Sequence, residues 1–190
     1  MKKTTILAAI VASSTALTAF AHGGATGIVK DRMDAMAEMG KAVKAVTPMM
    51  RGEAAYDADV LRQAAATFSR HAGEAMTQLF PEGTGGAPSE AKETVWTQWE
   101  EFSELAERLG VIAEGLAGAA DNGLMSSNGG AGMMGNGAMM GNSAMMGGGA
   151  MMDGGMMTAE QIASMPADGA FTMVTQVCSA CHTKFRTESQ

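Results

Sequence analysis

The chain has 190 residues, a mass of 19.5 kDa and a formal net charge of −7. An acidic chain lacks the clustered cations that nucleic acid binding needs, so nucleic acid is excluded as a partner. Hydrophobic residues make up 46% of the chain but aromatic residues only 5%, because alanine and methionine carry the apolar count. This composition favours helices over an all-β fold.

The first 21 residues are predicted to be a secretory signal peptide. Lys2 and Lys3 precede an apolar stretch over residues 6–20, and Ala19-Phe20-Ala21 has the small-x-small pattern of a cleavage site. The apolar stretch is shorter than the roughly 20 residues of a membrane-spanning helix. Cleavage after Ala21 would leave residues 22–190 as a periplasmic protein without a membrane anchor.

Four helical stretches are predicted in the mature chain, which indicates an all-α fold, an antiparallel four-helix bundle. They cover about residues 26–46, 57–81, 89–123 and 166–185. Pro48 is expected to stop the first helix and Pro81 the second, because proline cannot continue a helix. Asp57 or Asp59 is the expected N-cap of the second helix, and Pro166 the first position of the last.

A low-complexity segment separates the third and fourth helices. Residues 125–157 contain eleven methionines and eleven glycines, with paired methionines every six residues. Because each glycine costs a helix about 1 kcal/mol relative to alanine, residues 123–160 are interpreted as a flexible Met/Gly-rich insertion. Thioether sulfur suits Cu(I), so copper binding here is one hypothesis. An inert linker, an oxidant sink and a partner-docking surface are the alternatives.

Cys178-Ser-Ala-Cys181-His182 is the most informative motif in the chain. Its C-x-x-C-H spacing is the one that attaches c-type haem. On a helix, three and four residues make about one turn, so both thiols and the imidazole share one face. The thiols can form thioether bonds to the two haem vinyl groups, and His182 can bind the iron. A thioredoxin-like redox pair would follow a strand and a zinc site would need a fourth ligand; neither pattern is present.

This motif on the last of four helices makes the chain resemble the cytochrome c′ family, and in particular its low-spin, methionine-ligated members. The resemblance also covers Arg32-x-x-x-Met36, residues 48–53 and 56–58, Phe80-Pro81-Glu82-Gly83-Thr84, Val95-Trp96, Ala170-Phe171 and Phe185-Arg186. It implies a left-handed bundle with one covalent haem near one end. It further implies Arg32 near a haem propionate, Met36 facing the iron from the distal side, and Arg186 close to His182. The Met/Gly insertion has no counterpart in the family pattern.

Met36 separates two functions that the resemblance allows. If its sulfur binds the iron, the haem is six-coordinate, and His/Met ligation suits a one-electron carrier. If Met36 only lines the pocket, the haem is five-coordinate and high-spin and binds small gases such as nitric oxide or carbon monoxide. We expect ligation, and hence an electron carrier rather than an enzyme.

The acidic surface predicts a periplasmic redox partner with a positive face. The resemblance also makes a homodimer an option.

Overall fold

The computed structural model describes residues 24–125 and 156–187. The predicted signal peptide and most of the Met/Gly-rich insertion lie outside the described residues. So does the methionine repeat to which the copper hypothesis applies. The elements are α1 (Gly27–Met50), α2 (Ala58–Arg70), α3 (Glu74–Thr77), α4 (Thr94–Thr97), α5 (Trp99–Ala119), the 3₁₀ helix η1 (Ala120–Asn122), α6 (Ala159–Ala163) and α7 (Ala167–Phe185).

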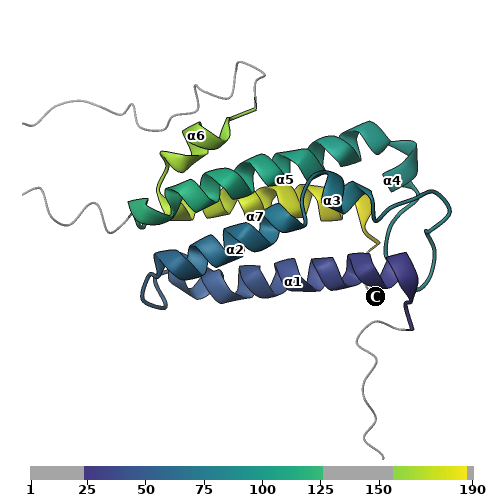
Figure 1. Ribbon diagram of the computed structural model, residues 1–190, viewed down its shortest axis with the longest axis horizontal. Helices are drawn as coiled ribbons and strands as arrows, with labels where there is room; N and C mark the ends of the chain where they lie inside the picture. Colours follow the sequence, from purple (N-terminus) through teal and green to yellow (C-terminus); the bar gives the residue numbers. More distant parts are fainter. Residues whose placement is uncertain (1–23, 126–155, 188–190) are drawn as a thin grey trace, which may run out of the picture.

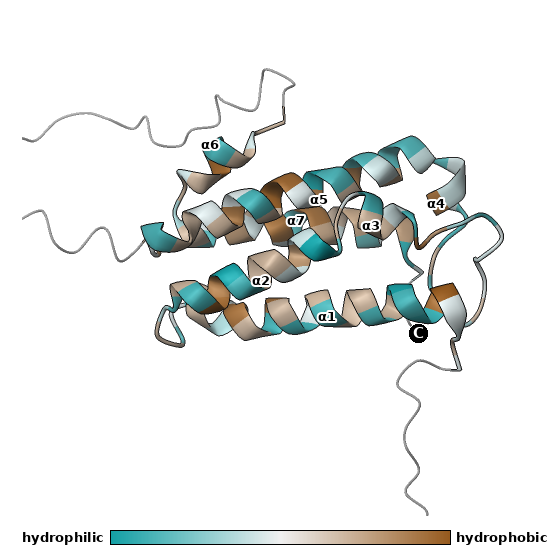
Figure 2. Ribbon diagram, viewed as in Figure 1, coloured by the Kyte–Doolittle hydropathy of each residue, from teal (hydrophilic) through white to brown (hydrophobic). Residues whose placement is uncertain are grey.

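Four long helices, α1, α2, α5 and α7, lie side by side and form the bundle (Figure 1). Helix α5 contacts α2, α6 and α7, whereas α1 packs mainly against α2 and makes few contacts with α7. Apolar residues lie between the helices and polar ones on the outside (Figure 2). The described residues form no strand, and only Ala91 and Arg186 make an isolated β-bridge. The predicted all-α four-helix bundle is therefore confirmed.

The described helices include none long and apolar enough to cross a membrane.

Helix α1 continues through Pro48, so the prediction that this proline stops the helix is wrong. Proline removes one backbone donor, but the turn around it closes through other groups. The Arg51 amide donates to the carbonyl of Thr47 over 3.1 Å, and the Glu53 amide to that of Pro48 over 2.9 Å. The Thr47 hydroxyl also donates to the carbonyl of Val43 at 2.7 Å.

The second predicted helix is two helices, α2 and α3, with a break at residues 71–73. Asp57 caps α2 as expected, since its carboxylate accepts from the amides of Asp59 and Val60 at 2.9 and 3.1 Å. Gly73 adopts a positive φ of 56°, which favours glycine. Its amide donates to the carbonyl of Ala106 on α5 over 2.8 Å. A contact between helices therefore sets the break.

The third predicted helix begins at Thr94 rather than near residue 89, and it is divided into α4 and α5. Residues 90–92 instead pair with the end of α7. It ends in η1 before Gly123, as predicted.

Helix α7 matches the expected range to within a residue, with Pro166 as its N-cap. Helix α6 begins at Ala159, so the last two residues of the predicted insertion, residues 123–160, are helical.

Helix α6 was not expected, and it lies against α5 at two glycines. A Cβ on Gly115 would come within 2.5 Å of the Ile162 Cβ, and one on Gly118 within 2.6 Å of the Ala163 Cβ. Ile162 is fully buried by this contact. Glycines on α5 thus allow the two helices to approach closely.

Candidate cofactor site

A cavity of about 570 Å³ lies between α1 and α7. Its volume falls within the range typical of small-molecule and cofactor sites. The segment from Phe80 to Val95 and Phe102 of α5 complete its walls. The lining residues are Arg32, Met33, Met36, Ala37, Gly40, Lys44, Phe80, Ser89, Glu90, Ala91, Val95, Phe102, Cys181, His182, Phe185 and Arg186.

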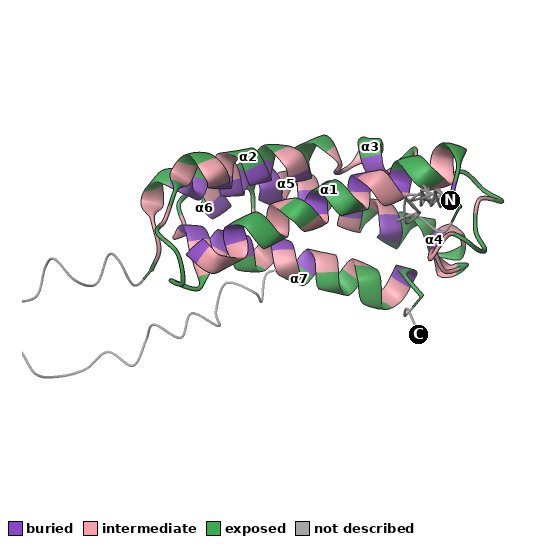
Figure 3. Ribbon diagram, turned by 90° about the horizontal axis from the view of Figure 1, so that it is seen from below, coloured by how far each residue is buried: buried purple, intermediate pink, exposed green. Residues whose placement is uncertain are grey.

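The C-x-x-C-H motif lies on the part of α7 that borders this cavity. No residue from 178 to 184 is buried, although Val174, Val177 and Phe185 on either side are (Figure 3). Both Cys178 and Cys181 are free thiols and half-buried. Cys181 and His182 line the cavity, whereas Cys178, one turn earlier, packs against the core and is not in the lining. The motif thus borders a space that protein side chains do not fill.

Desolvation shifts the pKa values of the motif side chains in the direction that favours their neutral forms. Burial raises the pKa of Cys178, and burial together with the neighbouring Cys178 raises the pKa of Cys181 to about 11. Desolvation, and to a smaller extent the charge of Arg186, lowers the pKa of His182. Neutral imidazole is the form that binds a metal, so His182 is ready to act as a ligand.

Arg32 is the buried charged residue of the described chain, with 4% of its surface exposed. Its guanidinium lies 4.6 Å from the centre of the Phe80 ring, and Nη2 donates to the carbonyl of Thr84. Nε and Nη1 have no hydrogen-bond partner, and desolvation lowers the pKa of this side chain. An unpartnered buried cation is costly, so these atoms indicate a missing anion.

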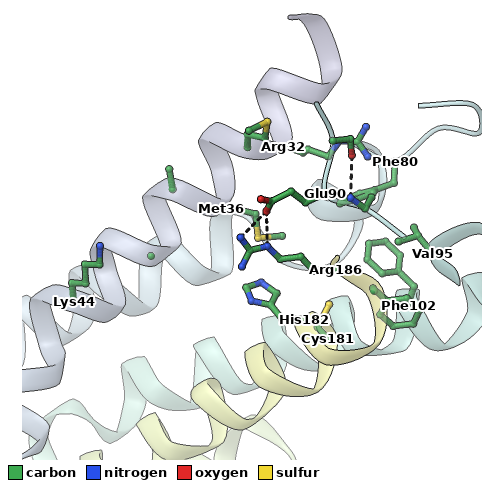
Figure 4. A pocket seen from close by; sticks show the side chains of 16 residues that line it. Arg32, Met36, Lys44, Phe80, Glu90, Val95, Phe102, Cys181, His182 and Arg186 are labelled. Atoms are coloured by element: carbon green, nitrogen blue, oxygen red, sulfur yellow. Dashed lines mark hydrogen bonds and ion pairs between the residues drawn. The ribbon is translucent and has the colours of Figure 1, made fainter. Parts of the chain in front are cut away.

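Met36 enters the same cavity from α1, across from His182 on α7 (Figure 4). Met33, Ala37 and Gly40 are its neighbours on this wall. Because Ala37 and Gly40 are small and the Met36 side chain is flexible, this wall can adjust its shape to a bound group. The structure therefore brings together five of the six predicted site residues, namely Arg32, Met36, Cys181, His182 and Arg186, with Cys178 adjoining them.

Arg186 is held at the cavity by Glu90, which the sequence analysis did not identify. The Arg186 Nε and Nη2 atoms both lie 2.6 Å from one Glu90 carboxylate oxygen (Figure 4). Phe80, under the Arg32 guanidinium, was also missed as a site residue, although it belongs to a quoted stretch of the resemblance. No local pattern pairs Glu90 with a residue 96 positions away.

Residues 90–94 fix the end of α7 by satisfying its terminal carbonyls, which no helical amide reaches. The Lys92 amide donates to the carbonyl of Phe185 over 2.9 Å, and the Thr94 hydroxyl to that of Lys184 at the same distance. The Thr187 amide donates to the carbonyl of Glu90 over 2.7 Å. These contacts position His182 and Arg186 relative to the rest of the cavity.

The residues present fit a covalently bound haem. They combine two free thiols at vinyl-attachment spacing, a neutral imidazole, a large cavity and a buried guanidinium with two unpartnered nitrogens. A haem propionate supplies the anion that Arg32 lacks, because guanidinium pairs well with carboxylate.

Comparisons with known proteins identify the family of the chain. Residues 27–135 match the family model described as Cytochrome C′. "Cytochrome c-556" of Agrobacterium tumefaciens (strain B2A) is 32% identical over 88 residues, 46% of this chain and 70% of the relative. "Cytochrome c′" of Pararhodospirillum photometricum is 33% identical over 96 residues, 50% of this chain and 75% of the relative.

Among solved structures, the fold is similar to a nitric oxide complex of a variant of cytochrome c′ from Alcaligenes xylosoxidans. The TM-score is 0.56 at 19% identity, over 85% of this chain and 94% of that one.

The chain therefore belongs to the cytochrome c′ family, whose members bind haem c covalently. The family match ends before residue 178, so the haem-attachment motif is independent evidence for the same conclusion.

Proposed function

We propose that the protein binds one haem c in the cavity between α1 and α7 and uses it to bind a small gas such as nitric oxide or carbon monoxide. Cys178 and Cys181 would hold the macrocycle, His182 would be the proximal ligand, and Arg32 would pair with a propionate. When bound, the haem supplies an iron centre that takes a diatomic ligand. This function was the alternative to electron transfer in the sequence analysis.

The observation that carries this proposal is the composition of the α1 wall opposite His182. Among the described lining residues, only His182 offers a ring nitrogen of the kind that haem iron binds. Between Arg32 and Lys44, the opposite wall is formed by Met33, Met36, Ala37 and Gly40, and the two small residues leave room for a ligand. The cytochrome c′ relatives, one of which forms a nitric oxide complex, support the same function.

One-electron transfer is the second candidate, and Met36 is the observation that favours it. Its thioether lies on the wall facing His182, where a sixth iron ligand would have to lie. Methionine at that place would close the iron to gases and raise its reduction potential. The two functions therefore differ in a single bond between Met36 and the iron.

Spectroscopy of the haem-loaded protein and two variants decides between them. Met36→Leu removes the sulfur at similar volume, and Met33→Leu is the matched control because Met33 lines the cavity from the same helix. Gas binding predicts a high-spin ferric signal in electron paramagnetic resonance, carbon monoxide binding when reduced, and no change in spin state for either variant. Electron transfer predicts a low-spin wild type and a high-spin Met36→Leu protein, with Met33→Leu unaffected.

A protein that is low-spin and closed to carbon monoxide would overturn gas binding. If Met36→Leu were also low-spin, it would overturn Met36 ligation as well.

We further propose that the mature protein is periplasmic. The signal peptide predicted at residues 1–21 supports this location. The acidic charge supports a basic partner protein.

A further inference from the structure

A second cavity, of about 360 Å³, lies between α5, α6 and α7. It shares no lining residue with the haem cavity. Met173 of this cavity lies eight residues before Cys181 on α7, which is about 12 Å along the helix axis. The lining residues are Arg108, Val111, Ile112, Glu114, Met156, Met157, Thr158, Ala159, Glu160, Ile162 and Met173.

Three methionines line this cavity, and they come from the two sides of α6 in the chain. Met156 and Met157 directly precede α6, while Met173 lies on α7. Met157 and Met173 are half-buried and pack against the core, whereas Met156 is 61% exposed. The cavity thus combines two positioned thioethers with one that an incoming ion can reach from solvent.

The fold holds the methionines through the start of α6. A capping box fixes Thr158, because its amide donates to the Gln161 side chain over 2.8 Å and its hydroxyl accepts from the Gln161 amide at 3.3 Å. Close packing of Ile162 on Gly115 then sets α6 against α5. Met156 and Met157, the two residues before Thr158, line the cavity together with Met173 of α7.

Charges around the cavity favour a monovalent cation. The ionisable lining residues are Arg108, Glu114 and Glu160, which together carry one net negative charge. Two carboxylates are too few for calcium, which takes six to eight oxygen ligands. Within residues 24–125 and 156–187, no group of three or more His, Cys, Asp and Glu side chains is arranged to hold a metal ion. The described residues around this cavity therefore offer no site for a hard cation such as calcium, or for zinc.

We propose that this cavity is a Cu(I) site formed by the thioethers of Met156, Met157 and Met173. Thioether sulfur is a soft ligand that selects Cu(I), and one bound Cu(I) would neutralise the net charge of the lining. Because Met173 comes from α7, the site depends on the folded bundle and not on the methionine repeat alone. The proposed Cu(I) site does not depend on whether the haem binds gases or transfers electrons.

Met173→Leu is the decisive variant, because it removes a sulfur that lies outside the methionine-rich segment and keeps a similar volume. Met125→Leu is the matched control: Met125 is 63% exposed, like Met156, but does not line the cavity. The full-length, haem-loaded protein is reduced without oxygen and dialysed against tetrakis(acetonitrile)copper(I) in competition with a Cu(I) chelator. Copper is measured by atomic absorption, and X-ray absorption at the copper edge counts sulfur neighbours.

We expect Met173→Leu to weaken one Cu(I) site about tenfold or more, as the loss of a ligand does, and to remove one sulfur from its first shell. Met125→Leu should match the wild type in both readouts. If Met173→Leu does not keep the helical circular dichroism of the wild type, the exposed Met156→Leu variant takes its place with the same expectation. Unchanged copper affinity in the folded variant, or no copper bound by the wild type, overturns the proposal.

Discussion

Arg32→Met should have different energetic effects with and without haem. Methionine keeps the approximate length of the side chain but removes the guanidinium nitrogens. In the haem-free protein, the substitution abolishes two unpartnered buried nitrogens, each costing about 1–3 kcal/mol. It also loses the bond to the Thr84 carbonyl and the stacking on Phe80, together about 2–4 kcal/mol. The net change in unfolding free energy without haem should therefore lie near zero or be slightly stabilising.

With haem attached, the same substitution leaves a propionate without its partner. Breaking a buried ion pair by removing one member typically costs about 3–5 kcal/mol. The Thr84 and Phe80 contributions are common to both forms and cancel in the comparison. The difference between the two effects therefore measures the coupling between Arg32 and the haem, as in a double-mutant cycle.

The assay is urea unfolding of the haem-loaded protein and of a haem-free Cys178→Ser/Cys181→Ser protein, each with and without Arg32→Met. Arg62→Met is the control, because Arg62 is paired with Asp59 and Asp121 on the exposed surface and should matter little in either form. If the haem-free protein does not fold cooperatively, the pH dependence of the reduction potential replaces unfolding. Removing Arg32 should then raise the pKa of the propionate. Equal effects in both forms, or an unchanged propionate pKa, would refute the pairing.

Three further predictions concern packing, thiol reactivity and association. Gly115→Ala should destabilise the protein by about 1–3 kcal/mol in urea unfolding, because its Cβ would meet Ile162 at 2.5 Å. Gly110→Ala should instead stabilise it by up to about 1 kcal/mol, since its Cβ meets Ala72 at an ordinary 3.6 Å; the same sign for both would contradict the packing of α6. In haem-free protein, alkylation of Cys181 by iodoacetamide should be slow at pH 8 and accelerate toward pH 11, because its pKa is about 11 and only the thiolate reacts; a rate that levels off near pH 9 would argue against this burial. Association with a basic partner should slow as salt rises, because the chain carries a net charge of −7; salt-independent stopped-flow rates would count against steering.

The haem motif was predictable from the sequence because its chemistry lies within five residues. Cys178, Cys181 and His182 need only a helix to share a face, and α7 supplies it. Arg32 and Met36 were placed by resemblance, and α1 brings both to the cavity. Spacing alone could not show that Arg32 is buried with two unpartnered nitrogens.

Features set by contacts distant in sequence were missed. Glu90 acquires its role from Arg186 at the end of α7, and the break after α2 depends on a bond from Gly73 to Ala106. Helix α6 is five residues long, and the Thr158-x-x-Gln161 capping pattern at its start is a local signal that the sequence analysis overlooked. In the first two cases the other half of the interaction comes from a different helix.

Intact-mass spectrometry of the protein made together with a cytochrome c maturation system tests covalent haem binding most directly. We predict that the denatured protein retains the mass of one haem, and that replacing either Cys178 or Cys181 leaves at most a single thioether link. A denatured wild-type chain with no added mass and two alkylatable thiols would contradict the assignment of this cavity to haem c.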